Sequence, residues 1–275
     1  MSNNLLRTIS GTVFGIVMLC GLLFNGYLFS ALIIFMMCSM MAEFYKMTMG
    51  EDYKFSRILA IASGVILYSL IYLTKVCGAH PKFVALAIIP VIVVMVNSLL
   101  VKDRSEFLKF AYIYTGILYI AVPLSLSNLI AFHHGEFNGT LLICFFVIIW
   151  CSDVGAYILG CTLGQKYGKK ICPEISPKKS WIGFWGGFLF AIIAAVVLHF
   201  CNLLQAPLIH CIILASLMHV AGVCGDFFES QWKRCCGLKD SGNIIPGHGG
   251  MLDRFDSTLM AMPIGAIYLA IFNLI

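Results

Sequence analysis

The sequence predicts an all-α, polytopic membrane protein with about nine transmembrane helices and a cytoplasmic N-terminus. Of its 275 residues, 60% are hydrophobic and only 11% are charged, whereas soluble globular domains carry about 25% charged residues. The mean hydropathy is +0.94. Several apolar runs are long enough to cross a hydrocarbon core of about 30 Å, and an isolated segment inside a bilayer satisfies its backbone only as a helix. These observations exclude a soluble globular protein.

Two shorter apolar runs come first, at residues 9 to 23 and 27 to 41. Between them, Asn25-Gly26 is typical of a turn, so the two runs are expected to form a tight helical hairpin. Seven longer runs follow, at residues 57 to 74, 83 to 101, 109 to 131, 140 to 160, 181 to 201, 207 to 228 and 257 to 274.

The distribution of positive charge predicts the orientation of these spans. With a cytoplasmic N-terminus, all but two of the 18 lysines and arginines face the cytoplasm, the exceptions being Lys75 and Lys82. This asymmetry follows the positive-inside rule. Residues 1 to 135 are expected to form an N-terminal region of about five spans, and residues 136 to 275 a C-terminal region of about four. Two long polar loops of the C-terminal region then face the cytoplasm, and they comprise residues 161 to 180 and 229 to 256.

The longer loop begins with ionisable side chains at helical spacing. If the eighth helix continues through Asp226, then Glu229 or Ser230, and next Lys233, fall on one face, because residues three or four apart are neighbours on a helix. A carboxylate, a hydroxyl and an ammonium group would then line one stripe at the boundary between membrane and water. A lysine at this boundary is also a common membrane anchor.

The same loop ends in a pair of aspartates. Asp253 and Asp256 are three residues apart at the start of the last apolar run, so their carboxylates can converge on one point. Paired carboxylates suit magnesium, which proteins usually hold with one or two carboxylates plus substrate phosphates. An aspartate that only caps the helix N-terminus is the structural alternative. Just before the pair, Pro246-Gly247-His248-Gly249-Gly250 offers backbone that a phosphate can approach closely, although a plain turn would use the same glycines.

The shorter loop and the helix before it add a second polar group. Asp153 lies within the sixth apolar run, where an ionisable residue is a functional hypothesis by default, although neighbouring helices could also satisfy it. Lys178 and Lys179 can meet phosphates or be attracted to the anionic lipid surface. Small residues in the seventh run are expected to permit close helix packing, and they are Gly183, Gly186 and Gly187.

The longer loop resembles the signature of a known family. Its run S-x-x-K-R-x-x-x-x-K-D-x-G-x-x-x-P-G-H-G-G-x-x-D-R-x-D, from Ser230 to Asp256, looks like that of the phosphatidate cytidylyltransferases, also called CDP-diacylglycerol synthases, without a gap over 27 residues. The stretch SPKKSWIGFWGG, residues 176 to 187, resembles a second block of the family. Together with Asp153 and Tyr157, the resemblance covers about residues 140 to 275.

Outside this part the resemblance is weaker. In the first half, only the hydropathy and an Ala42-Glu43-Phe44 element are similar to the family. The family commonly has Thr-Trp-Glu-Gly where this chain has Ser180-Trp181-Ile182-Gly183. Position 182 therefore lacks the family's carboxylate, whereas the signature run is intact.

The resemblance implies a reaction in which CTP and phosphatidic acid give CDP-diacylglycerol and pyrophosphate. It implies magnesium as the cofactor, with a second cation left open. The expected partners are CTP, phosphatidic acid and membrane lipids, with no nucleic acid, and a homodimer is left open. The expected location is the bacterial inner membrane, with the active site facing the cytoplasm.

The expected site residues fall into three groups. Catalysis is assigned to Asp226, Lys233, Arg234, Lys239, Asp240 and Arg254. Substrate binding is assigned to Asp153, Lys178, Lys179, Ser230, Gly247, His248, Gly249 and Gly250. Metal binding is assigned to Asp226, Asp253 and Asp256.

Two histidines are not expected to transfer protons in the reaction. A phosphate monoester has a second pKa of about 6 and becomes a dianion with little help. His248 is therefore expected to hydrogen-bond phosphate or support the loop rather than act as a general base. His219, inside the eighth apolar run, is expected to be a satisfied core histidine.

Two other classes of function stay open at this point. A CTP-dependent polyprenol kinase would also need carboxylates and basic residues beside a lipid, but it would transfer the γ-phosphoryl group and release CDP. A transporter or channel could use Asp153, Asp226 and His219 as an ion path, although transporters tend to place such groups near the membrane midplane. A CDP-alcohol phosphotransferase is disfavoured because its D-G-x-x-A-R run is absent.

Overall fold

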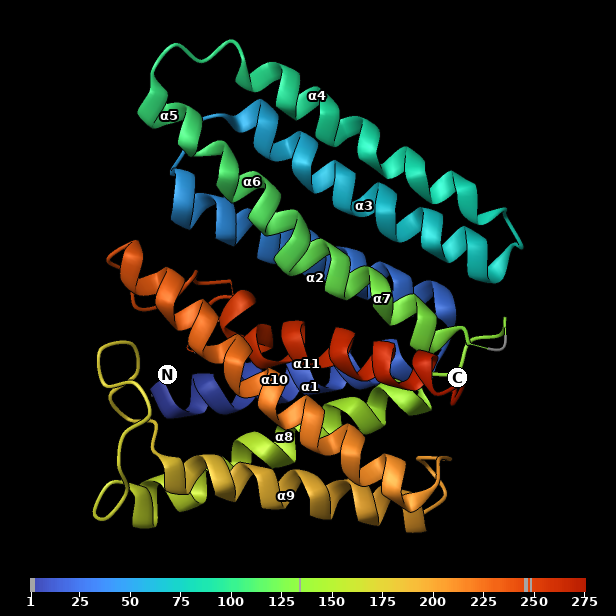
Figure 1. Ribbon diagram of the computed structural model, residues 1–275, viewed down its shortest axis with the longest axis vertical. Helices are drawn as coiled ribbons and strands as arrows, with labels where there is room; N and C mark the ends of the chain where they lie inside the picture. Colours follow the sequence, from blue (N-terminus) through green and yellow to red (C-terminus); the bar gives the residue numbers. More distant parts are fainter. Residues whose placement is uncertain (1–2, 134, 245–246, 248) are drawn as a thin grey trace. The chain divides into compact units, whose positions relative to one another are not determined.

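The computed structural model describes residues 3–133, 135–244, 247 and 249–275, and their regular structure is α-helical, without a β-strand (Figure 1). The chain divides into two compact units. Unit 1 comprises Met1–Asn138 and Cys236–Arg254, and unit 2 comprises Gly139–Cys235 and Phe255–Ile275. The main boundary lies three residues from the expected one at 135. Residues 236 to 254 belong to unit 1, whereas the expected C-terminal region included them.

Unit 1 is built around one long apolar helix, α2, which is preceded by α1. Asn25 caps α2 by accepting a hydrogen bond from the Leu28 N–H at 2.8 Å, so the expected turn between the first two runs is confirmed. Side chains of α2, Phe44 and Tyr45 among them, form the core of the unit. The helical segments of unit 1 are α1 (Asn3–Leu23), α2 (Gly26–Met49), α3 (Lys54–Val76), the 3-10 helix Pro81–Ala87, α4 (Ile88–Ser98), α5 (Arg104–Leu108), α6 (Phe110–Gly116), the π-helix Ile117–Ala121 and α7 (Val122–Ala131).

Unit 2 contains α8 (Thr140–Leu159), which continues as a π-helix over Gly160–Gly164, α9 (Trp181–Phe200), α10 (Leu208–Cys235) and most of α11 (Leu252–Ile271). Helix α9 packs along α8 and also contacts α10. A Cβ atom at Gly183 would lie 3.0 Å from the Ala156 carbonyl oxygen, and one at Gly187 would lie 2.9 Å from that of Ser152. The expected role of these glycines in close helix packing is confirmed.

Seven helical segments in the described part of the chain are long and apolar enough to cross a membrane. They correspond to all the expected spans except the first and the last, which fall on α1 and α11. The count of nine and the cytoplasmic N-terminus remain predictions. The seven segments are Gly26–Met49, Lys54–Val76, Pro81–Ser98, Glu106–Ala131, Thr140–Gly164, Trp181–Phe200 and Leu208–Cys235.

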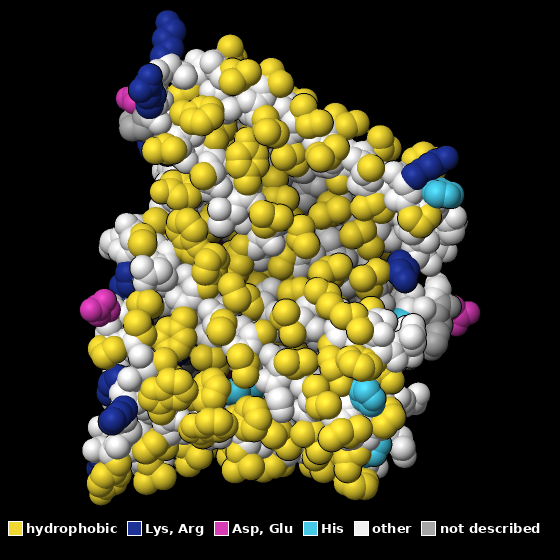
Figure 2. All heavy atoms as spheres, in the orientation of Figure 1, with side chains coloured by type: hydrophobic (Ala, Val, Ile, Leu, Met, Phe, Trp, Pro, Cys, Tyr) yellow, Lys and Arg dark blue, Asp and Glu magenta, His cyan; other side chains and the backbone are white. Residues whose placement is uncertain are grey.

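The exposed side chains are those expected of a membrane protein. Hydrophobic side chains dominate the face in Figure 2, and lysines and arginines gather at its margins. Trp185 and Val197 of α9 are 59% and 54% exposed. Apolar exposure on this scale indicates contact with lipid, because soluble monomers expose only small apolar patches.

Candidate active site

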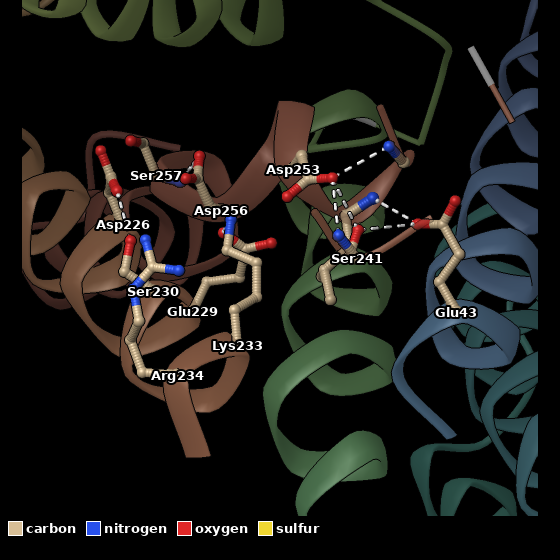
Figure 3. Close-up of polar contacts among 12 residues, drawn as sticks. Glu43, Asp226, Glu229, Ser230, Lys233, Arg234, Ser241, Asp253, Asp256 and Ser257 are labelled. Carbon is tan, nitrogen blue, oxygen red and sulfur yellow. Dashed lines mark hydrogen bonds and ion pairs between the residues drawn. The ribbon is translucent and has the colours of Figure 1, made fainter. Parts of the chain in front are cut away.

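The end of α10 carries the stripe that the sequence predicts. The helix continues through Asp226 to Cys235. Ser230 Oγ donates to Asp226 Oδ1 at 3.3 Å, and Lys233 Nζ lies 2.6 Å from Glu229 Oε2 (Figure 3). Glu229 and Lys233 are buried. Both pairs are four residues apart, so helical periodicity alone brings them together.

Lys179 extends this stripe from the loop before α9. Its ammonium group forms an ion pair with the Asp226 carboxylate and lies 4.5 Å from the centre of the Phe227 ring. Lys178 is exposed, and its carbonyl oxygen accepts a hydrogen bond from the Gln165 side chain at 2.7 Å. The two adjacent lysines therefore differ: within the described part of the chain, Lys179 pairs with a carboxylate of α10 and Lys178 does not.

Helix α11 contributes a further carboxylate, that of Asp256, because Gly225 allows α10 and α11 to approach closely. A Cβ atom at Gly225 would collide with the Asp256 carbonyl oxygen. Asp256 interacts electrostatically with Asp226, Glu229 and Asp153. Burial raises the pKa of the Asp256 carboxyl well above its usual range, and these three neighbouring charges raise the pKa further.

We call this set of unit 2 side chains the carboxylate–lysine cluster. It consists of Asp153, Lys179, Asp226, Glu229, Ser230, Lys233 and Asp256. Its carboxylate oxygens are the hard donors that magnesium prefers, so the donor chemistry fits that ion. Within the described residues, no three His, Cys, Asp or Glu side chains are already gathered as a metal site. Asp226 and Glu229 pair with lysines instead.

A second polar group lies within unit 1, at the start of α11. Asp253 Oδ2 accepts hydrogen bonds from the Ser241 N–H at 2.9 Å, the Ser241 hydroxyl at 3.0 Å and the Gly250 N–H at 2.9 Å. This carboxylate oxygen therefore connects residues 241 and 250 of the longer loop, which we call the signature loop. These contacts are closer to those of an aspartate that caps a helix N-terminus than to those of a metal ligand.

Glu43 of α2 completes the same group, although no role was predicted for it from the sequence. Its Oε1 accepts from the Met251 N–H at 2.9 Å, and its Oε2 accepts from the Leu252 N–H at 2.9 Å and from the Ser241 hydroxyl at 3.3 Å (Figure 3). The available signal in the sequence was a carboxylate within a largely apolar run. We call Glu43, Ser241, Asp253 and the amides of residues 250 to 252 the loop latch.

The glycines of the signature loop have the conformations that only glycine adopts easily. Gly247 and Gly249 have φ angles of 77° and 86°, in the region that L side chains disfavour. A Cβ atom at Gly250 would lie 2.6 Å from Glu43 Oε2. The loop's own conformation therefore requires glycine at these three positions. The approach of a phosphate to this backbone remains a prediction. His248 lies outside the described residues.

The remaining predicted residues lie at the surface. Lys239, Asp240 and Arg254 are exposed. Asp240 lines a cavity of about 680 Å³ within unit 1, together with Lys46, Arg57 and residues 241 to 244. Arg234 donates from Nε to the Ile175 carbonyl oxygen at 3.4 Å.

His219 lies in the interior of unit 2. Its Nδ1 is 2.7 Å from Ser152 Oγ, and its ring packs against Phe184 and Phe188. The expected core position is confirmed, but the ring is only partly satisfied, because its Nε2 is buried without a hydrogen-bond partner among the described residues.

The helices and the carboxylate–lysine cluster define a polytopic membrane protein with charged side chains gathered at the ends of apolar helices. The chain belongs to the cytidylyltransferase family, whose model, described as "Cytidylyltransferase family", matches residues 5–272. It is similar to proteins named phosphatidate cytidylyltransferase. The Bacillus subtilis protein is 34% identical over 192 residues, covering 68% of each chain, and the Rickettsia bellii protein is 34% identical over 220 residues, covering 78% of this chain and 91% of the relative. The Staphylococcus epidermidis protein is 33% identical over 173 residues, covering 62% of this chain and 64% of the relative.

Proposed function

We propose that the chain is a phosphatidate cytidylyltransferase, which converts CTP and phosphatidic acid to CDP-diacylglycerol and pyrophosphate. The carboxylate–lysine cluster carries this proposal. It places acidic and basic side chains together at the end of α10, where a lipid substrate and a water-soluble substrate can meet. The family match over nearly the whole chain and the names of the relatives support the same activity.

The chemistry requires two polyanions to come together. A phosphatidate oxygen attacks the α-phosphorus of CTP, and the bond to the departing pyrophosphate breaks in line with the attack. Lys179 and Lys233 already lie against carboxylates, so each can exchange its carboxylate for a phosphate oxygen when substrate arrives. Such an exchange neutralises charge on the transferring group, which is the largest contribution that a protein makes to reactions of this kind.

Magnesium is part of this proposal. Asp226 and Asp256 would hold it, and the crowding of like charges around Asp256 supports a cation there. When bound, the ion neutralises phosphate oxygens. Asp253 remains a predicted third ligand.

We further propose that the protein lies in a bacterial inner membrane with its active site at the cytoplasmic face. The distribution of lysine and arginine supports this orientation, and so does the need for CTP. The similar proteins from Bacillus subtilis, Rickettsia bellii and Staphylococcus epidermidis are bacterial.

The test uses purified full-length protein in detergent with magnesium, phosphatidic acid and CTP labelled at the α-phosphate. The label should enter the lipid phase together with an equimolar release of pyrophosphate, and a chelator should abolish both. A control variant is Glu136→Gln, which should keep full activity because Glu136 is exposed and is not part of the cluster. Release of CDP would instead indicate a lipid kinase. Folded protein without any product would contradict the proposal.

A further inference from the structure

Glu43 is a buried acidic side chain at the end of an apolar helix. It lies in α2, is 6% exposed, and falls inside a candidate membrane span. A charged group at such a position is unfavourable unless strong partners compensate for its lost hydration. Among the described residues, the donors within hydrogen-bond distance of Glu43 all lie about 200 residues further along the chain.

The hydrogen-bond donors around Glu43 explain why a carboxylate occupies this position. The first N–H groups of a helix have no acceptor within the helix, and the helix dipole favours a negative charge at that end. The two oxygens of Glu43 accept from the N–H groups of Met251 and Leu252, one each and both at 2.9 Å. Glu43 therefore caps α11 from a different helix, which fixes both the position and the direction of the start of α11.

Ser241 connects this cap to Asp253. Its hydroxyl oxygen lies 3.3 Å from Glu43 Oε2 and 3.0 Å from Asp253 Oδ2. A hydroxyl has one proton, so it donates to one carboxylate at a time. The Ser241 N–H donates to Asp253 in addition. Glu43 and Asp253 thus hold the same short segment of backbone from two directions.

The packing leaves little room for another arrangement. A Cβ atom at Gly242 would lie 2.8 Å from Glu43 Cδ, and one at Gly250 would lie 2.6 Å from Glu43 Oε2. The loop backbone therefore rests directly on the Glu43 carboxylate. A shift of this side chain would have to move the loop and the first turn of α11 with it.

We propose that Glu43 is a positioning residue for cytidylyl transfer. It does not contact the reacting atoms; it holds the first turn of α11, and α11 carries Asp253 and Asp256. This inference rests on the proposed function. Its physical basis is that a misplacement of about 1 Å in a catalytic group can reduce the rate about 100-fold.

The experiment compares wild type, Glu43→Gln and the control Glu136→Gln in full-length protein. Glutamine keeps the size of the side chain, but its NH₂ group would face an N–H donor, so one cap bond is lost. Glu136 is exposed and belongs to the same unit of the chain. We expect kcat of Glu43→Gln to fall about 100-fold with KM for CTP changed less than about threefold. Glu136→Gln should keep wild-type values.

A second measurement separates positioning from general stability. Hydrogen–deuterium exchange, recorded without substrate or metal, should become faster at the amides of Met251 and Leu252 in Glu43→Gln, while peptides of α9 keep wild-type exchange. Wild-type kcat in the variant would overturn the proposal. So would a reduced kcat with unchanged exchange at these two amides.

A third variant, Glu43→Asp, tests the proposal if Glu43→Gln does not fold. Glu43→Asp keeps the charge but is one methylene shorter, so it cannot reach both amides, and it should retain fold with kcat reduced about tenfold. Wild-type kcat in this variant would overturn the proposal. If wild type itself makes no labelled lipid, the proposed function fails; loss confined to the Glu43 variants concerns the positioning role alone.

Discussion

Lys233 Nζ lies 2.6 Å from Glu229 Oε2, one helical turn away on α10, and both residues are buried. A buried ion pair loses much of its Coulomb gain to desolvation, so its net contribution to stability is small, but removing one partner leaves the other charge uncompensated. The pair is therefore suited to exchange one anion for another. A phosphate of the substrate could take the place of Glu229 beside Lys233.

Lys233→Met should lower the free energy of unfolding by about 3 kcal/mol, because Glu229 then keeps a buried charge without its lysine. The double variant Glu229→Gln/Lys233→Met should recover most of this loss. Activity should stay low in both variants, since each lacks the ammonium group for phosphate. Thermal unfolding and labelled-CTP turnover measure the two effects. Recovery of activity in the double variant would show that Lys233 acts only through stability.

Asp256→Asn should reduce turnover at least 100-fold while the protein stays folded. Burial and the charges of Asp226 and Glu229 disfavour the ionised form of Asp256, so a neutral amide at this position should leave the thermal unfolding temperature equal or higher. The measurement pairs initial rates with a melting curve in detergent. Near-normal turnover would remove Asp256 from the proposed magnesium site.

Asp253→Asn should behave differently from Asp256→Asn, because Asp253 Oδ2 accepts three hydrogen bonds from the loop. Hydrogen bonds to a charged acceptor are stronger than those to a neutral one, so we expect stability to fall by about 2 kcal/mol along with activity. Comparison of the two melting curves tests this contrast. Equal stability of both variants would contradict a structural role for Asp253.

Lys179→Met should raise KM for at least one substrate about tenfold, with a smaller effect on protein stability, because the Lys179 and Asp226 side chains are each about 30% exposed. Lys166→Met is the matched control, since Lys166 is an exposed lysine of the same loop. Initial rates at varied CTP and at varied phosphatidic acid separate the substrates. Unchanged KM for both would leave Lys179 with a structural role.

Gly250→Ala should abolish most activity, because the added methyl group would meet Ser241 Oγ and Glu43 Oε2. Gly15→Ala is the control: a Cβ atom there meets nothing within 4 Å, and alanine favours a helix. Turnover per folded molecule is the readout. An active Gly250→Ala variant would show that the loop latch tolerates displacement.

Some parts of the site could be predicted because they depend on nearby residues. The pairs Asp226–Ser230 and Glu229–Lys233 follow from helical spacing once α10 continues past the membrane. The left-handed angles of Gly247 and Gly249 agree with a glycine run. The predicted convergence of Asp253 and Asp256 depends on their spacing alone, and it remains a prediction.

The sequence by itself determined the helical class, the seven apolar segments, the Asn25 cap and the stripe on α10, because hydropathy and spacing act within one or two helical turns. Only the tertiary structure decided that Glu43 holds the amides of Met251 and Leu252, and that Lys179 rather than Lys178 pairs with Asp226. These contacts join residues far apart in the chain, and no periodicity relates them. Their physical cause is that a buried carboxylate must find donors wherever the packed helices present them.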